Sequence, residues 1–259
     1  MYEKELEAMI NTAKKARDVI MDVYQKGFEI EIKEDDSPVT IADKMSDELI
    51  RKELGELFPS YGFLTEESED TKERLNKEFI FIVDPLDGTA DFVTKDDEFA
   101  TNIALCRNHE IVAGVIAIPA KNEYFYASKG SGAFKIESDG SVHPIHVNDK
   151  LTDLTLLVSH RHASLKEIAI YENHRDRVTK LEKVGSSYKS CKVAEGKAEL
   201  NIKLDAGTKE WDVAPCSIIV KEAGGIFCNP DMSEMKFNRE DVYNHDGYCI
   251  MNRIENKLY

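Results

Sequence analysis

The stretch at residues 79–92 reads FIFIVDPLDGTADF, and it is the most informative segment of the chain. Its apolar opening, FIFIV, predicts a strand that ends abruptly at Asp84-Pro85. Open sheets tend to build their sites at the carboxyl ends of strands, and this is where Asp84 and Asp87 stand. Together with the exposed Leu86 carbonyl they offer hard oxygen ligands, which suit Mg²⁺, Mn²⁺ or Ca²⁺.

The same letters also fit a solvated turn, because Asp, Pro and Gly are the usual turn formers. Gly88 lets a ligand approach the backbone, and Thr89 adds a hydroxyl. Two other acidic segments favour a site: Glu66-Glu67 follows the apolar GFL, and Asp212 opens an apolar helix. Asp212 alone is ambiguous, since an acidic side chain at a helix N-terminus is favourable in itself. Together these carboxylates form an oxygen-rich set large enough for two or more divalent ions.

Other site chemistries find little support in the sequence. An EF-hand needs ligands at alternate positions, whereas Pro85 and Leu86 occupy the interval here. An aspartyl-phosphate phosphatase places its two strand-end aspartates two residues apart, whereas Asp84 and Asp87 are three apart. The chain also has no GxxxxGK[ST] loop, no GxSxG elbow and no HExxH motif.

The hydrophobic patterning outside this segment predicts an α+β first half, residues 1–150, and an α/β second half, residues 151–259. The polar stretch at 140–153 is the candidate boundary between them. In the first half we expect an amphipathic opening helix, a strand at 28–33, a helix at 41–57 and an antiparallel meander at 99–128. In the second half we expect strands at 154–160 and 199–204, and helices at 165–171 and 211–223.

The charge balance bears on possible partners. The 259 residues carry 34 Lys and Arg against 49 Asp and Glu, a net charge of −15. This argues against non-specific binding to nucleic acid or anionic membranes, which reward clustered cations. The opening MYEKELEAMI does not resemble a secretory signal and no apolar run is long enough to span a membrane, so we expect a cytoplasmic protein. The five widely spaced cysteines favour buried reduced thiols over disulfides or a zinc site.

Several motifs resemble, in order, the signatures of the lithium-sensitive inositol monophosphatase superfamily. They are GFLTEES at 62–68, DPLDGT at 84–89, and WDVAP at 211–215 followed by EAGG at 222–225. Within that superfamily the chain is most similar to the 3'(2'),5'-bisphosphate nucleotidases. The segments that suggest this subgroup are SPVTIAD at 37–43, EFATNIAL at 98–105, VSH at 158–160 and GSSYKSCKVAEG at 185–196. The resemblance covers nearly the whole chain and implies a layered αβαβα sandwich.

The resemblance also implies roles for individual residues. The metal ligands it implies are Glu66, Asp84, Asp87, Asp212 and the Leu86 carbonyl. They would hold two or more Mg²⁺ ions, with Mn²⁺ as a possible substitute and Li⁺ as an expected inhibitor. Thr89 falls on the hydroxyl that orients the attacking water, and Asp43 on the carboxylate that accepts from this threonine. Glu67 would lie behind Glu66 rather than on the ion. Dimers are usual in the superfamily, so a homodimer is possible.

The substrate pocket is implied in the same way. Its residues would be Gly88 and Thr89 beside the phosphate, Ser159 and His160, Gly185, Ser186 and Ser187, and Asp212. Lys189 or Lys192 would meet a second phosphate. The alternative interpretation is that Ser186 or Ser187 caps a helix and both lysines lie on a solvated face. We expect His143, His146 and His162 to be structural or surface histidines.

This chain departs from the family pattern in two places. Asp205–Glu210 stands where the family often has a glycine- or proline-rich connector, and Val213 stands where nucleotidases commonly carry threonine. Both departures bear on the substrate, and the roles of Lys189, Lys192 and Glu210 stay open.

These observations predict a Mg²⁺-dependent phosphomonoesterase that removes the 3'-phosphate of adenosine 3',5'-bisphosphate. One alternative is an inositol monophosphatase or a sugar phosphatase such as a fructose-1,6-bisphosphatase. An alternative of another class is a non-catalytic acidic protein that binds metal or phosphate. Asp43 and Thr89 argue against this last class, because binding alone needs no pair of groups that activates water.

Overall fold

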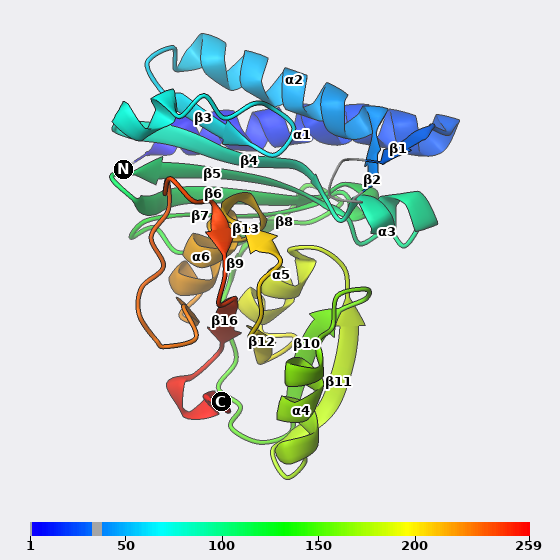
Figure 1. The fold of residues 1–259 in the computed structure, drawn as a ribbon, viewed down its shortest axis with the longest axis vertical. Coiled ribbons are helices and arrows are strands. Elements are labelled where there is room, and N and C mark those ends of the chain that lie inside the picture. Colours follow the sequence, from blue (N-terminus) through cyan, green and yellow to red (C-terminus); the bar gives the residue numbers. More distant parts are fainter. Residues whose placement is uncertain (1, 33–37) are drawn as a thin grey trace.

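The computed structural model describes residues 2–32 and 38–259 (Figure 1). The helices are α1 (Glu3–Lys26), α2 (Ile41–Leu57), α3 (Thr89–Thr94), α4 (Leu165–Asn173), α5 (Tyr188–Ala194) and α6 (Glu210–Glu222). The strands of the first half are β1 (Ile30–Ile32), β2 (Pro38–Thr40), β3 (Gly62–Thr65), β4 (Phe79–Asp87), β5 (Ala100–Arg107), β6 (Glu110–Ile118), β7 (Glu123–Ser128), β8 (Ala133–Ile136) and β9 (Val142–Ile145). The later strands are β10 (Leu154–Ser159), β11 (Val178–Val184), β12 (Leu200–Lys203), β13 (Thr208–Lys209), β14 (Ile226–Cys228), β15 (Tyr243–Asn244) and β16 (Tyr248–Met251).

The elements stack in five layers, which confirms the predicted αβαβα sandwich (Figure 1). Helices α1 and α2 cover one face of a seven-stranded sheet with the order β3-β4-β5-β6-β7-β8-β9. Helices α5 and α6 lie between this sheet and a five-stranded sheet with the order β11-β10-β12-β16-β14. Helix α4 packs on the outer face of the second sheet. One apolar core thus spans both halves of the chain, while the division into domains at residue 150 stays a prediction.

Strand β4 shows why the first sheet can be covered on both faces. Ile80 and Ile82 point into the core formed with α5 and α6, whereas Phe81 and Val83 point into the core under α1 and α2. Successive side chains of a strand face opposite sides, so an unbroken apolar run is what a doubly covered strand requires.

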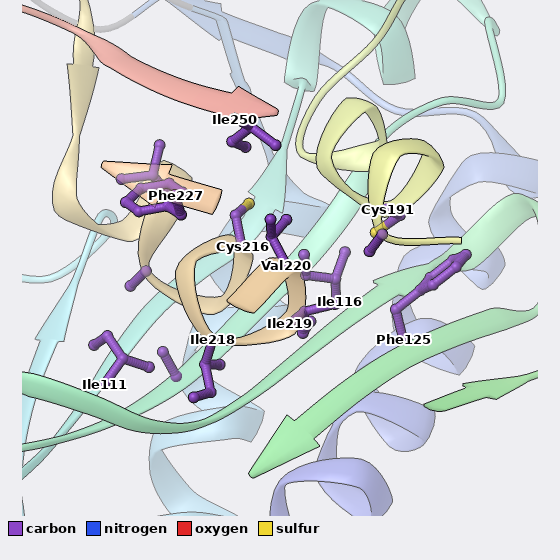
Figure 2. Close-up of a cluster of buried hydrophobic side chains, with 14 of the residues drawn as sticks. Ile111, Ile116, Phe125, Cys191, Cys216, Ile218, Ile219, Val220, Phe227 and Ile250 are labelled. Carbon is purple, nitrogen blue, oxygen red and sulfur yellow. The ribbon is translucent and has the colours of Figure 1, made fainter. Parts of the chain in front are cut away.

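Helix α6 approaches the seven-stranded sheet closely (Figure 2). Gly114 of β6 makes this approach possible, because a Cβ there would lie 2.9 Å from the Cα of Pro215. Ile218 and Ile219 of α6 then pack among sheet residues such as Ile116. The start of α6, which carries Asp212, is therefore held at a fixed height above the sheet.

The observed helices and strands match most of those predicted from the hydrophobic patterning. Strands β5, β6 and β7 pair antiparallel, which confirms the meander, and β3 pairs parallel with β4. Helix α2 has the predicted bounds, and α6 begins and ends one residue earlier than predicted. The predicted end of the strand at Asp84 is wrong, because β4 continues through an irregular register to Asp87. The patterning did not predict α3, α5 or β11, which are short or half-exposed elements.

Some expectations concern single residues. Lys33, at the end of the predicted strand, and Ser37, in the motif at 37–43, lie outside the described residues. The five cysteines are all free and buried, as predicted. In the part of the chain that the structure describes, no helix combines the length and apolarity needed to cross a bilayer.

Candidate active site

The DPLDGT segment forms an irregularity in the pairing of β4 with β5. Asp84 is opposite Asn102 and Asp87 is opposite Ala100, so three steps along β4 match two along β5. Pro85 sits in this irregularity, where its missing N–H leaves no ladder bond unmade. Its carbonyl accepts hydrogen bonds from the hydroxyls of Ser46 and Thr101, each at 3.1 Å. The irregularity thereby re-aims both aspartates toward a common cleft.

Three carboxylates from three elements meet in this cleft. Glu66 follows β3, Asp84 lies in β4, and Asp212 lies in the first turn of α6. One ligand oxygen from each lies within 4.8 Å of the others. The Asp212 carboxylate also accepts a hydrogen bond from the Lys209 amide at 2.6 Å, and that of Asp84 accepts one from the Leu86 amide at 3.1 Å. The segments around the two aspartates thus fix their orientation.

The electrostatics of this cluster favour a cation. Burial raises the pKa of Asp84 well above its usual range, and the nearby charges of Glu66, Asp87 and Asp212 raise it further. Burial likewise raises the pKa of Asp212, followed by the charges of Asp87 and Glu66. Buried like charges at this spacing are costly unless a cation compensates them. All the donors are hard oxygens, so the chain's residues fit a divalent metal ion such as those predicted from the sequence.

Asp87 lines the same cleft but is also tied to the second half of the chain. Its carboxylate accepts a hydrogen bond from the Ser187 amide at 2.6 Å, and the Ser187 hydroxyl donates to the Asn102 side chain at 2.7 Å. Burial raises the pKa of Asp87, and the charge of Lys189 partly offsets this rise. Asp87 therefore joins the acidic end of the cleft to the start of α5.

Thr89 and Asp43 meet across 46 residues of sequence. The Thr89 hydroxyl donates to Oδ1 of Asp43 at 2.9 Å, with the Leu86 carbonyl as the alternative acceptor at 3.2 Å. Asp43 is held by a capping box at the start of α2, in which its Oδ2 accepts from both the amide and the hydroxyl of Thr40 at 2.7 Å. Burial raises the pKa of Asp43 against these hydrogen bonds. The pair is thus preorganised on the edge of the cleft.

The cleft has a volume of about 560 Å³. The lining around the acidic cluster consists of Glu66, Asp84, Leu86, Asp87, Gly88, Thr89 and Asp212. Ser159, Ser186 and Ser187 also line it, as the sequence predicted. The remaining lining includes Arg161, His162, Glu167, Lys189, Lys203 and Asp205. A single cavity therefore holds the acidic cluster together with several cationic side chains.

Two predicted pocket residues lie elsewhere among the described residues. His160 is not in the lining, because its ring lies between Asp91 at 3.5 Å and Glu98 at 3.2 Å. Gly185 is not in the lining either, and a Cβ there would lie 2.7 Å from the Glu98 carbonyl oxygen. Both positions join the two halves of the chain, and their assignment to the substrate is not supported by this geometry. His162, expected to be structural or on the surface, is exposed and also lines the cleft.

Of the two lysines, only Lys189 is among the described residues that line the cleft. Lys189 is buried, so its placement on a solvated face is wrong; its ammonium donates to the Ser186 carbonyl at 2.6 Å. Burial lowers the pKa of Lys189 although the charge of Asp87 opposes this. Lys192 forms an ion pair with Glu182 at 2.6 Å and does not appear in the described lining of the cleft.

Glu210 organises the segment before Asp212. Its buried carboxylate accepts hydrogen bonds from the amides of Asn238 and Arg239, at 2.6 and 2.8 Å, and from the Arg239 side chain at 3.0 Å. The side chain of Glu210 thus fastens the start of α6 to the loop before β15. This is a structural role, which the sequence left open.

The comparison with known proteins agrees with this arrangement. The sequence pattern of the Inositol monophosphatase family matches residues 1–258. The chain belongs to this family. The 3'(2'),5'-bisphosphate nucleotidase CysQ of Salmonella typhimurium is a relative with 36% identity, over 95% of this chain and 98% of its own.

Solved structures of family members share the fold. CysQ of Bacteroides thetaiotaomicron superposes with a TM-score of 0.83 and 29% identity, covering 98% of this chain and 99% of that one. The extragenic suppressor protein suhB of Bartonella henselae superposes with a TM-score of 0.82 and 28% identity, covering 99% and 97%. Metal dependence is general in the inositol monophosphatase family, and this chain has the acidic cluster for it.

Proposed function

We propose that this family member is a Mg²⁺-dependent phosphomonoesterase that converts adenosine 3',5'-bisphosphate to AMP and phosphate. The observation that carries the proposal is the composition of one cleft, where a cluster of carboxylates and Thr89 share a cavity with Arg161, Lys189 and Lys203. Asp43 accepts a hydrogen bond from Thr89 at the edge of this cleft. A phosphate ester with a second phosphate needs both a cation-binding end and cationic side chains. The relatives named 3'(2'),5'-bisphosphate nucleotidase support this choice of substrate.

Glu66, Asp84 and Asp212, with Asp87 and the Leu86 carbonyl, would hold the Mg²⁺. When bound, a divalent ion neutralises phosphate charge and lowers the pKa of a coordinated water. The same ligands are the proposed site of Mn²⁺ substitution and of Li⁺ inhibition. The second phosphate would be compensated by the cationic side chains of the cleft.

The protein's own proton path consists of two groups. The Thr89 hydroxyl has a lone pair with which it accepts a hydrogen bond from a water in the cleft, while its proton points at Oδ1 of Asp43. As the water attacks phosphorus, its proton passes to the Thr89 oxygen and the threonine proton passes to Asp43. The bond from phosphorus to the 3'-oxygen breaks, and that oxygen takes up a proton from solvent water. A raised pKa makes Asp43 a better acceptor, because the buried carboxylate holds a proton more readily than an exposed one.

A substrate comparison tests the proposal. Phosphate release from adenosine 3',5'-bisphosphate, inositol 1-phosphate and fructose 1,6-bisphosphate is measured at equal concentration with Mg²⁺, with and without Li⁺. We expect the nucleotide to be preferred and Li⁺ to inhibit. Preference for inositol 1-phosphate would reassign the substrate. If none of the three compounds is hydrolysed, the proposal that the protein is a phosphomonoesterase is refuted. Asp87→Asn should lose activity with all three, whereas Thr179→Ala on the exposed edge of β11 should not.

A further inference from the structure

Lys203 is a cation of the cleft that already faces two carboxylates of the protein. It ends β12, and its side chain is 13% exposed. Its ammonium lies 2.7 Å from Oδ1 of Asp205 and 3.7 Å from Oε1 of Glu167, and donates to the His162 carbonyl at 3.3 Å. A phosphate oxygen that approaches Lys203 therefore competes with these two carboxylates for the charge of the ammonium.

Two of the three partners are fixed. The His162 carbonyl belongs to the backbone. Glu167 is 4% exposed in its side chain and closes the capping box of α4, where it accepts from the Ser164 amide at 2.7 Å. Moving either would break the helix start or leave a buried carboxylate without a partner, which is costly.

Asp205 is the partner that can leave. Its side chain is 34% exposed, and it lines both the cleft and an adjoining pocket of about 620 Å³, into which the carboxylate can turn. Its contact with Lys203 is short, yet the buried Oδ1 makes no aligned hydrogen bond. An ion pair without an aligned hydrogen bond at a partly exposed site is weak and easily exchanged.

The local charge determines how the movement of Asp205 affects binding of a second phosphate. With both carboxylates in place, Lys203 and its two acidic partners sum to one negative charge, which repels a phosphate. When Asp205 turns away, Lys203 and Glu167 are left neutral as a pair and no longer carry a net negative charge. A substrate without a second phosphate has no group that binds Lys203, so its binding does not require Asp205 to turn away.

We propose that Asp205 is a specificity-determining residue that competes with a substrate's second phosphate for Lys203 and so limits the preference for bisphosphates. This inference rests on the proposed function. Asp205 lies between β12 and β13, and the segment around it belongs to the same cleft.

The experiment compares two substrates that differ by one phosphate, adenosine 3',5'-bisphosphate and 3'-AMP. The measured quantity is the ratio of their kcat/KM values with Mg²⁺. Asp205→Asn keeps the shape and removes the competing charge, so the ratio should rise by about two- to fivefold, as expected for a partly exposed ion pair. Lys203→Gln should lower it by about tenfold. In the Lys203→Gln background, Asp205→Asn should no longer raise the ratio.

Asp246→Asn is the matched control, because Asp246 lines only the adjoining pocket and the variant makes the same change of charge. Its ratio should equal that of the wild type. A ratio that falls or stays constant in Asp205→Asn would overturn the inference, since it would mean that Asp205 orients Lys203 or does not act on it.

Failure of the proposed function gives a different result. A wild type that hydrolyses neither nucleotide fails as a nucleotidase, whatever Asp205 does. The dissociation constants of the two nucleotides, measured by calorimetry with Ca²⁺, then replace the kinetic ratio. The same two- to fivefold shift in Asp205→Asn would support the competition, and its absence would overturn it.

Discussion

The acidic cluster should make the metal-free protein less stable than a variant with one carboxylate fewer. Glu66, Asp84 and Asp212 each place an oxygen within 4.8 Å of the others. Two charges at that distance repel by about 3.5 kcal/mol at an effective dielectric constant of about 20. Protonation relieves part of this, because burial and neighbouring charges raise the pKa of Asp84. We therefore expect Asp84→Asn to stabilise the metal-free protein by about 2 kcal/mol, or about 4–8 °C in Tm.

Bound Mg²⁺ should reverse the order of stability, so that the wild type becomes more stable than Asp84→Asn. A ligand that binds only the folded state at 100 times its Kd adds about 2.7 kcal/mol, so Mg²⁺ should raise the Tm of the wild type by about 5–11 °C. Asp84→Asn should respond much less, because it lacks a ligand. Asn at position 84 can still accept the hydrogen bond from the Leu86 amide, so the turn is preserved.

The assay is thermal unfolding in EDTA and in Mg²⁺, at pH 5 and pH 8. The sign follows from the raised pKa of Asp84: the folded protein binds more protons than the unfolded chain, so its stability falls as pH rises. The advantage of Asp84→Asn in EDTA should thus be larger at pH 8. Asp139→Asn, in the exposed turn after β8, is the control. An Asp84→Asn protein less stable than wild type in EDTA would refute the reasoning.

Three other changes probe separate parts of the account. Thr89→Ala removes the group between water and Asp43, so kcat should fall by about 100-fold or more with little change in KM; a kcat within threefold of wild type would contradict the proton path. Although burial opposes it, hydrogen bonds from Arg74 lower the pKa of Asp70 to about 2, so Asp70→Asn should cost about 2 kcal/mol in urea unfolding at pH 7. That difference should vanish as pH falls from about 4 to about 2, and a constant difference would contradict it. Glu222→Leu removes two hydrogen bonds to amides of the turn after β7 and should cost about 2–3 kcal/mol with KM unchanged; unaltered stability would rule out this clamp.

The sequence predicted those parts of the site whose geometry is local. Asp84, Leu86 and Asp87 lie within one short segment. Asp43 and Thr89 are 46 residues apart, and only the family resemblance paired them. The convergence of Glu66, Asp84 and Asp212 depends on strands β3 and β4 and helix α6 coming together. The acidic segments alone suggested one oxygen-rich set, and the family resemblance named its members as metal ligands.

The sequence alone could not show which cationic side chains and histidines line the cleft. Lys203 ends an alternating strand, and alternation shows which side chains share a face but not which strand end meets a cleft. His160 and His162 stand two residues apart in the turn after β10, where the backbone direction decides which ring enters the cavity. Lys189 was expected on a surface or on a phosphate, and its burial follows from the packing of α5 between the two sheets.

The most direct test of the central claim is the identity of the nucleotide formed from adenosine 3',5'-bisphosphate. The protein is incubated with this substrate and Mg²⁺, and the product is separated chromatographically at low conversion against 5'-AMP and 3'-AMP standards. We predict 5'-AMP with one equivalent of phosphate, and no product in EDTA. Formation of 3'-AMP, or no nucleotide product under conditions where inositol 1-phosphate is hydrolysed, would contradict the account.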